Sequence, residues 1–126
     1  MKRFWIGICV LLLLLVSGWI TTVAIARCYT PISRDLASAS QAARDGNWAL
    51  AVRASEQAEE KWQHCKDFTA AFADHSVLEE MEGQFAQVAV FRQANAQLSF
   101  AAACTNLSKL AEAIAQSHLP IWQNLL

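Results

Sequence analysis

Residues 4–26 read FWIGICVLLLLLVSGWITTVAIA, twenty-three positions without a charged side chain. A helix of this length rises about 35 Å, at about 1.5 Å per residue, which exceeds the roughly 30 Å hydrocarbon core of a membrane. Because lipid offers no hydrogen-bond partners, such a segment is stable in a bilayer only as a helix. The sequence therefore predicts a transmembrane helix over residues 4–26, in contact with membrane lipid.

The charges that flank this segment predict its orientation. Lys2 and Arg3 precede it together with the terminal amine, whereas the first positive residue after it is Arg27. Short basic flanks stay in the cytoplasm, so residues 1–3 are expected inside and residues 27–126 outside. We predict a single-pass protein of the cell membrane with a cytoplasmic N-terminus and an extracytoplasmic domain.

The same segment also has features of a cleaved signal peptide. Ala24-Ile25-Ala26 has the A-x-A form of a cleavage site. The apolar stretch is long for a signal peptide, whose apolar region spans about 7–15 residues, and this length favours a retained signal anchor. Under either interpretation the rest of the chain is exported.

Small residues recur at every fourth position near the end of the apolar segment. Gly18, Thr22 and Ala26 lie on one helical face, where small side chains let two membrane helices approach closely. They are candidates for pairing with a second copy or with another membrane helix. The alternative is that this face contacts only lipid.

The exported part has eight basic and eleven acidic side chains, a net charge of −3. A nucleic-acid partner requires a basic surface, so this balance argues against one. The three histidines and four cysteines show none of the close pair spacings typical of metal ligands. No metal and no other cofactor is therefore expected.

Helix-favouring residues dominate the chain after the apolar segment. Alanine, glutamine and glutamate are abundant, while glycine and proline are scarce. The predicted helices cover residues 31–45, 48–73, 77–93 and a final stretch that ends before Pro120. A break near Asn95 and one continuous helix through Cys104 are both compatible with the sequence. The predicted fold class is all-α: one N-terminal transmembrane helix followed by a small antiparallel bundle of three or four helices.

Turn-forming residues set the predicted helix boundaries. Thr30-Pro31 has the form of an N-cap followed by proline at the first helical position. In Gly46-Asn47, the glycine tolerates the left-handed conformation that ends helices, and the asparagine can cap the next one. Ser76 followed by Glu79 has the form of a capping box. These signals predict that a new helix begins after each of the three positions.

Apolar side chains recur at intervals of three and four in each predicted helix, which directs one face of the helix toward a core. Trp48 and Trp62 both lie on the stripe of the second predicted helix. Both are expected to pack in the core, and the alternative is that one of them lines a groove. The other predicted core positions are Ile32, Leu36, Ala39, Ala43, Val52, Ser55, Ala58, Cys65, Thr69, Phe72, Leu78, Met81, Phe85, Val88, Phe91, Phe100, Cys104, Leu107, Leu110 or Ala111, and Ile114.

Three of the four cysteines are predicted to be exported, and Cys9 lies in the apolar segment. An odd number leaves room for one disulfide, and Cys65–Cys104 is the pair that we would test first. Isolated buried thiols are the simpler interpretation.

Four landmarks in the chain carry a resemblance to a known family. After the apolar segment they are Gly46-Asn47-Trp48-Ala49-Leu50-Ala51, Trp62, Phe72-Ala73-Asp74-His75 and Asn124-Leu125-Leu126. With them the chain resembles a family of small bacterial membrane-anchored proteins of unknown function, numbered 4363 among such domains. The resemblance covers nearly the whole chain, supports the architecture and implies no activity. Candidate partner-contact or family-motif positions are Trp48, Trp62, Phe72, Asp74, His75 and Asn124.

Asp74-His75-Ser76 combines the residue types of a catalytic triad, but the three are consecutive. Sequence neighbours at a turn cannot point at one another as a triad requires, so we interpret the trio as a helix junction. We expect no enzyme.

The function that these features favour is an interaction module: a membrane-tethered helical bundle that binds another envelope protein or itself. The alternatives are a ligand-binding or sensing domain with an apolar pocket between its helices, and a soluble exported domain released by signal-peptide cleavage.

Overall fold

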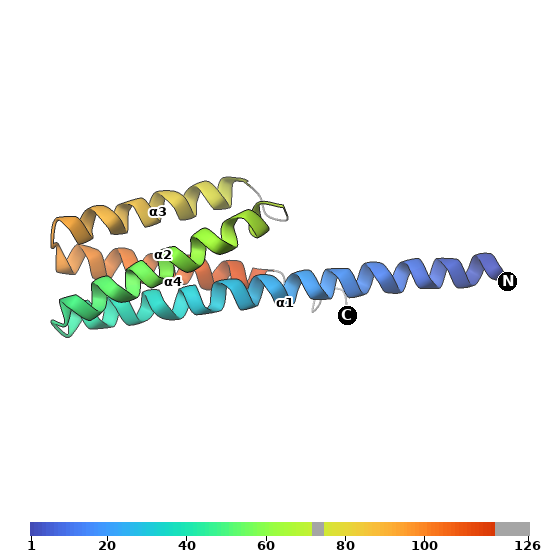
Figure 1. The fold of residues 1–126 in the computed structure, drawn as a ribbon, viewed down its shortest axis with the longest axis horizontal. Helices are drawn as coiled ribbons and strands as arrows, with labels where there is room; N and C mark the ends of the chain where they lie inside the picture. Colours follow the sequence, from blue (N-terminus) through green and yellow to red (C-terminus); the bar gives the residue numbers. More distant parts are fainter. Residues whose placement is uncertain (72–74, 118–126) are drawn as a thin grey trace.

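The computed structural model describes residues 1–71 and 75–117, and every regular element within these ranges is an α-helix (Figure 1). The elements are α1 (Lys2–Arg44), α2 (Trp48–Ala70), α3 (His75–Gln93) and α4 (Gln97–Ser117). They form an up-and-down bundle from which the N-terminal half of α1 projects alone. The predicted fold class is confirmed, and α3 and α4 are two helices rather than one.

The two halves of α1 have different surroundings. The helix has 43 residues, which corresponds to about 65 Å. Twelve large apolar side chains between Phe4 and Ile20 are 43–72% exposed, because no other described helix lies beside them (Figure 1). This half is long and apolar enough to cross a membrane. Beyond it, one face is buried in the bundle, through Thr22, Ile25, Tyr29, Ile32, Leu36, Ala39 and Ala43.

The expected helix start at Thr30-Pro31 is wrong, because α1 runs through Pro31 without a break. A proline inside a helix removes one backbone hydrogen bond, here to the carbonyl of Arg27, and costs about 3 kcal/mol. The buried stripe keeps its spacing of four and three on both sides of the proline. Packing of Tyr29 and Ile32 in the same core therefore holds the helix straight through this position.

The turn after α1 follows the sequence signals. Gly46 has φ +84°, the left-handed region that glycine adopts without steric cost. The side chain of Asn47 accepts a hydrogen bond from the backbone N–H of Leu50 at 3.3 Å, which caps α2 as predicted. Asn95, with φ 54°, makes the corresponding break between α3 and α4.

The predicted capping box at Ser76 is wrong in its register. α3 already begins at His75, so Ser76 lies in the first helical turn instead of at the N-cap position. Boundaries shift easily by one or two residues where several polar residues in a row can cap a helix.

Hydroxyl groups and small residues join α1 to α4. Ser40 Oγ donates to the carbonyl of Ala101 at 3.0 Å, and Ser33 Oγ donates to the carbonyl of Ser108 at 3.1 Å. Ser40 lies seven residues after Ser33 on α1, and Ala101 lies seven residues before Ser108 on α4. The two helices are antiparallel with a defined register. Most predicted core positions within the described residues are buried, whereas Trp48, Val52, Leu78 and Phe91 are partly exposed. Of the two alternatives in α4, Ala111 is fully buried and Leu110 is partly exposed.

Candidate functional site

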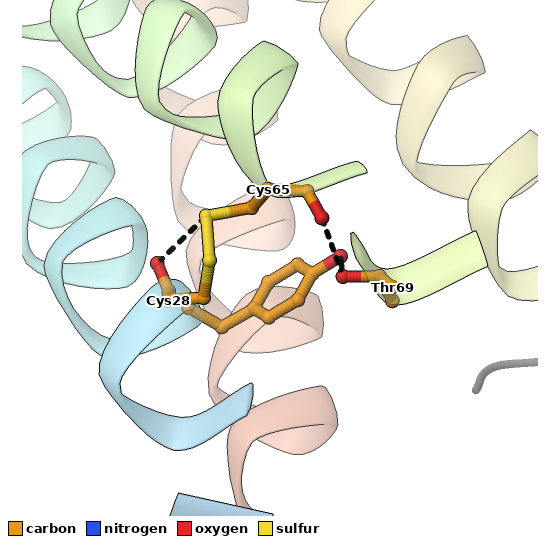
Figure 2. The surroundings of a disulfide bond; sticks show 4 residues. Cys28, Cys65 and Thr69 are labelled. Carbon is orange, nitrogen blue, oxygen red and sulfur yellow. Dashed lines mark hydrogen bonds between the residues drawn. A yellow bond between two sulfur atoms is a disulfide. The ribbon is translucent and has the colours of Figure 1, made fainter. Parts of the chain in front are cut away.

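A disulfide joins α1 to α2 just beyond the apolar half of α1 (Figure 2). It links Cys28 and Cys65, whose Cα atoms are 6.1 Å apart. The Cys65–Cys104 pair that the sequence suggested is therefore wrong, and Cys104 is a free, buried thiol on α4. Burial raises the pKa of the Cys104 thiol to about 12. The disulfide closes a loop between helices where the chain leaves the apolar segment.

The sequence reasoning missed Cys28 because it placed a helix break between this residue and the bundle. The signal that identifies it is the stripe Ile25, Tyr29, Ile32 and Leu36, which runs in phase through Pro31. The three cysteines after the apolar segment allow three pairings, and only the register of α1 against α2 selects among them. The same register brings Lys61 Nζ to 2.6 Å from Asp35 Oδ2 on the side of α1 that faces α2.

A buried polar pair lies beside the disulfide (Figure 2). Tyr29 Oη donates to Thr69 Oγ1 at 2.9 Å, and Thr69 Oγ1 donates to the carbonyl of Cys65 at 2.9 Å. Tyr29 is fully buried, and its burial raises the pKa of the phenol above 10.0. These bonds satisfy the polar groups of a tyrosine that fills the core at this end of the bundle.

Trp62 is a core residue. It is 2% exposed, and its ring stacks on Phe85 of α3 with 5.0 Å between centroids. The Lys66 ammonium lies 5.5 Å from the Trp62 ring centroid, within the range of a cation–π interaction. The ring N–H of Trp62 is buried, and among the described residues no acceptor lies at hydrogen-bonding geometry to it. Trp62 thus joins α2 to α3 through its contact with Phe85.

Trp48 begins α2 at the opposite end of the same helix. It is half-buried and packs edge to face against Phe100 of α4, with 4.9 Å between ring centroids. Between the two tryptophans, Ala51, Ser55 and Ala58 are buried along the same face of α2.

A cleft of about 240 Å³ opens between α2 and α3 beside Trp62. His75, one of the predicted site residues, is exposed at its edge. The cleft combines a few apolar walls with charged side chains of both signs; it is lined by Trp62, Lys66, Asp67, Ala70, His75, Leu78, Glu79 and Glu82. Further along, Arg92 closes the same seam by donating to Ser55 Oγ at 3.1 Å and pairing with Glu59 at 3.4 Å. The candidates Phe72, Asp74 and Asn124 lie outside the described residues.

The small-residue face of the apolar segment continues into a groove on α1. Thr22 is buried, and its hydroxyl donates to the carbonyl of Gly18 at 2.9 Å. Gly18 and Ala26 are partly exposed. A hollow of about 400 Å³ follows this face, lined by Thr22, Val23, Ala26, Arg27, Thr30 and Pro31.

The end of the bundle farthest from the N-terminus exposes three apolar side chains that the sequence reasoning did not single out. Leu50, Val90 and Leu98 are 50%, 60% and 83% exposed. They come from the start of α2, the end of α3 and the start of α4, which meet at this end (Figure 1). Each of the three lies outside the buried apolar stripe of its helix. An apolar residue at such a position is the signal in the sequence that could have identified them as exposed.

Groups able to do chemistry are dispersed over the described part of the chain. His64 and His75 are exposed on different helices, and His118 lies beyond the described residues. Among residues 1–71 and 75–117, no three histidine, cysteine or acidic side chains lie close enough together to hold a metal ion.

Comparison with known proteins identifies the family. No curated protein and no solved structure matches the chain. The sequence model of one family, described as "Domain of unknown function (DUF4363)", matches residues 19–125. This match begins in the apolar half of α1 and includes all of α2, α3 and α4. The chain is a member of the DUF4363 family.

Proposed function

We propose that the protein is a membrane-tethered module that binds another protein of the cell envelope. In this proposal the first half of α1 crosses the membrane with residues 1–3 in the cytoplasm, and the bundle lies outside. The observation that carries the tethering is the apolar surface between Phe4 and Ile20, which the described helices leave uncovered. Exposed apolar area of this size is unfavourable in water and favourable in lipid.

The disulfide supports an extracytoplasmic bundle. Disulfides persist in oxidising compartments and are rare in the cytosol, where thiols are kept reduced. Cys28–Cys65 lies just beyond the apolar half of α1. If the bundle faced the cytoplasm, this bond would be exposed to a reducing pool.

The packing of α1 supports a retained anchor over a cleaved signal peptide. Cleavage after Ala26 would remove Thr22 and Ile25 from the bundle, and the Ile25 side chain is fully buried in its core. The residues of the A-x-A tripeptide are also part of a continuous helix. Release of the bundle would therefore expose core surface at its membrane-proximal end.

The surface that we propose for the partner is the distal end, defined by Leu50, Val90 and Leu98. It lies opposite the anchor, where a partner has free access (Figure 1). The three exposed side chains belong to helix ends that share one end of the bundle, and exposed apolar patches are typical of interaction sites. We propose binding rather than catalysis as the role of this protein.

A ligand-binding role at the cleft between α2 and α3 is the weaker proposal. Its walls carry Lys66, Asp67, His75, Glu79 and Glu82, so the cleft does not match the apolar pocket that such a role was expected to use.

Photo-cross-linking in native membranes tests the proposal. A photoreactive amino acid at Leu98 should give a discrete adduct heavier than the monomer. The matched control is Gln57, which is exposed in the middle of α2 and should give none. The substitution Val90→Glu should abolish the adduct at position 98 while the disulfide still forms. Recovery of monomer alone from the Leu98 variant, at normal expression, contradicts the proposal.

A further inference from the structure

A groove with mostly basic charged side chains runs along the outside of the bundle between α1 and α4. Two adjoining hollows of about 310 and 290 Å³ form it, and Ala37 and Glu112 belong to the lining of both. The charged side chains of the lining are Arg34, Arg44, Lys109 and Glu112, three basic and one acidic, a net charge of +2. We call this surface the basic groove.

The three cations of the basic groove are not used inside the bundle. In the part of the chain that the structure describes, the ion pairs are made by Lys61 and Arg92. Arg34, Arg44 and Lys109 are exposed and take part in neither pair. The chain as a whole has a net charge of −1. Positive charge that gathers on one face of such a chain, without acidic neighbours to neutralise it, favours an acidic partner at that face.

The cleft between α2 and α3 has the opposite charge. With its histidine neutral, its charged side chains are Asp67, Glu79 and Glu82 against Lys66, a net charge of −2. We call this surface the acidic cleft. Glu56 is exposed eleven residues before Asp67 on α2, which is about three helical turns, so it continues the acidic surface along the same side of the helix.

The basic groove and the acidic cleft lie on opposite sides of the bundle. α1 packs against α2 and α4, and α3 packs against the same two helices, so α1 and α3 are diagonal to each other (Figure 1). The side between α1 and α4 is therefore opposite the side between α2 and α3. A second bundle placed alongside the first in the same orientation thus brings its acidic cleft to the basic groove.

The charges on the two sides also match in order and spacing. Because α1 and α2 are antiparallel neighbours, Arg34 and Asp67 lie toward the apolar half of α1. Arg44 and Glu56 lie toward the distal end. The two arginines are ten residues apart, about 15 Å along α1, and the two acids are eleven residues apart, about 17 Å along α2. Parallel bundles therefore bring Arg34 toward Asp67 and Arg44 toward Glu56.

We propose that the basic groove of one copy packs against the acidic cleft of a second copy, with the two bundles side by side and parallel. A two-fold symmetric pair would place like charges against each other at either surface. The contact is therefore head-to-tail, and its repetition gives a ring or a row of copies. This self-association goes beyond the proposed function and leaves the distal end free. Its parallel orientation rests on the proposed tether, because anchors in one membrane point the same way.

Photo-cross-linking of the purified full-length protein in lipid vesicles tests this proposal. A photoreactive amino acid at Ala37, which is exposed in the basic groove, should give adducts of two and more chains. Peptide mapping should place the second attachment on α2 or α3. The matched control is Gln57, which is exposed on α2 outside the lining of both surfaces and should give a several-fold lower yield.

Charge reversal tests which surfaces meet. Arg34→Glu with Arg44→Glu reverses the groove, and Glu56→Arg with Asp67→Arg reverses the other side. Each double variant alone should lose adducts at position 37 several-fold, because like charges then face each other. The two double variants mixed in the same vesicles should regain the adducts, because each then meets an opposite charge on both sides. High salt should lower the wild-type yield, since exposed charges are screened.

Four results would overturn the proposal. They are monomer alone at position 37, attachment to α1 or α4 of the second copy, adducts that do not respond to charge reversal, and no recovery in the mixture while the native disulfide is intact. Flotation of the vesicles tests the tether separately. Protein that does not float contradicts the proposed tether and the parallel orientation that rests on it, whereas protein that floats as a monomer contradicts only the self-association.

Discussion

The two halves of α1 are made of one continuous helix but present opposite surfaces. From Phe4 to Ile20 the helix is apolar all round and uncovered, whereas from Thr22 to Ala43 it buries a single stripe and exposes polar residues elsewhere. A helix that is apolar all round is typical of a membrane span, and one with a stripe is typical of a bundle in water. The contrast shows that one continuous helix presents two kinds of surface without a break between them.

The absence of a break has a mechanical consequence. A flexible linker would let the bundle move freely relative to the anchor, but α1 passes from one half to the other as a regular helix (Figure 1). The disulfide at Cys28 then attaches α2 to the same helix close to the transition. The orientation of the bundle is thereby coupled to that of the apolar half of α1.

The largest expected effect comes from charge placed in the first half. Leu12→Arg with Leu13→Arg puts two unpaired charges near the centre of the span, at about 2.5–3.5 kcal/mol each on insertion scales. We expect most of the protein to leave the membrane fraction after centrifugation. Leu36→Arg is the matched change in the second half, where the side chain is fully buried. It should unfold the bundle but leave the chain in the membrane, and loss of both variants from the membrane would contradict the division of α1.

The next effect concerns the core that the second half helps to form. Trp62→Ala should lower the free energy of unfolding by about 3–5 kcal/mol, because it removes a buried ring that stacks on Phe85. Urea unfolding in mild detergent, followed by circular dichroism, measures it. Leu98→Ala, at a position that is 83% exposed, is the control and should change stability by less than about 0.5 kcal/mol. Equal changes in the free energy of unfolding for the two variants would mean that Trp62 is not part of the core.

A smaller loss of stability is expected when the disulfide between α1 and α2 is removed. Cys28→Ser opens a loop with a sequence separation of 37, for which a disulfide typically stabilises a fold by about 2–4 kcal/mol. We expect the variant and the reduced wild-type protein to unfold at the same, lower urea concentration. If reduction destabilises the Cys28→Ser variant further, another disulfide must be present.

The smallest expected effect is a decrease in the stability of the bundle at alkaline pH. The folded-state pKa of Cys104 is raised from 9.0 to about 12, so folding favours the protonated thiol. Its contribution to stability is complete below pH 9 and is lost as the pH rises toward 12, with about 1 kcal/mol lost by pH 10. Burial raises the pKa of Tyr29 as well, which acts in the same direction. Cys104→Ala should remove part of the decline in the free energy of unfolding above pH 9, measured by urea unfolding at a series of pH values. A pH dependence identical to that of the wild type would contradict this assignment.

The residue pattern predicted the fold where each signal was local. The stripe from Trp62 to Thr69, the glycine turn at Gly46 and the cap at Asn47 depend on residues close in sequence. The continuity of α1 was missed because a local rule about Pro31 outweighed a stripe that spans it. The disulfide was missed for a different reason, since its pairing depends on how α1 and α2 are aligned in space. Contacts such as Ser40 with Ala101 likewise depend on a register that no single helix encodes.

The candidate site was less predictable than the fold. Trp62 was placed in the core by its spacing, but its role as the contact to Phe85 depends on α3. Leu50, Val90 and Leu98 come from three helices, and the up-and-down order of these helices brings the residues to one end of the bundle. The spacing of apolar residues indicates which face of each helix is polar. It does not indicate which apolar residues on the polar faces of different helices come to the same end of the bundle.

The measurement that tests the central claim most directly is thiol labelling in intact cells. In a Cys9→Ser background, Gln57→Cys places one accessible thiol on α2, because Cys28 and Cys65 are paired and Cys104 is buried. A membrane-impermeant maleimide should label this variant before lysis. Lys2→Cys, on the predicted cytoplasmic side, should be labelled only after lysis. Labelling of Lys2→Cys in intact cells, with Gln57→Cys protected until lysis, would contradict the account.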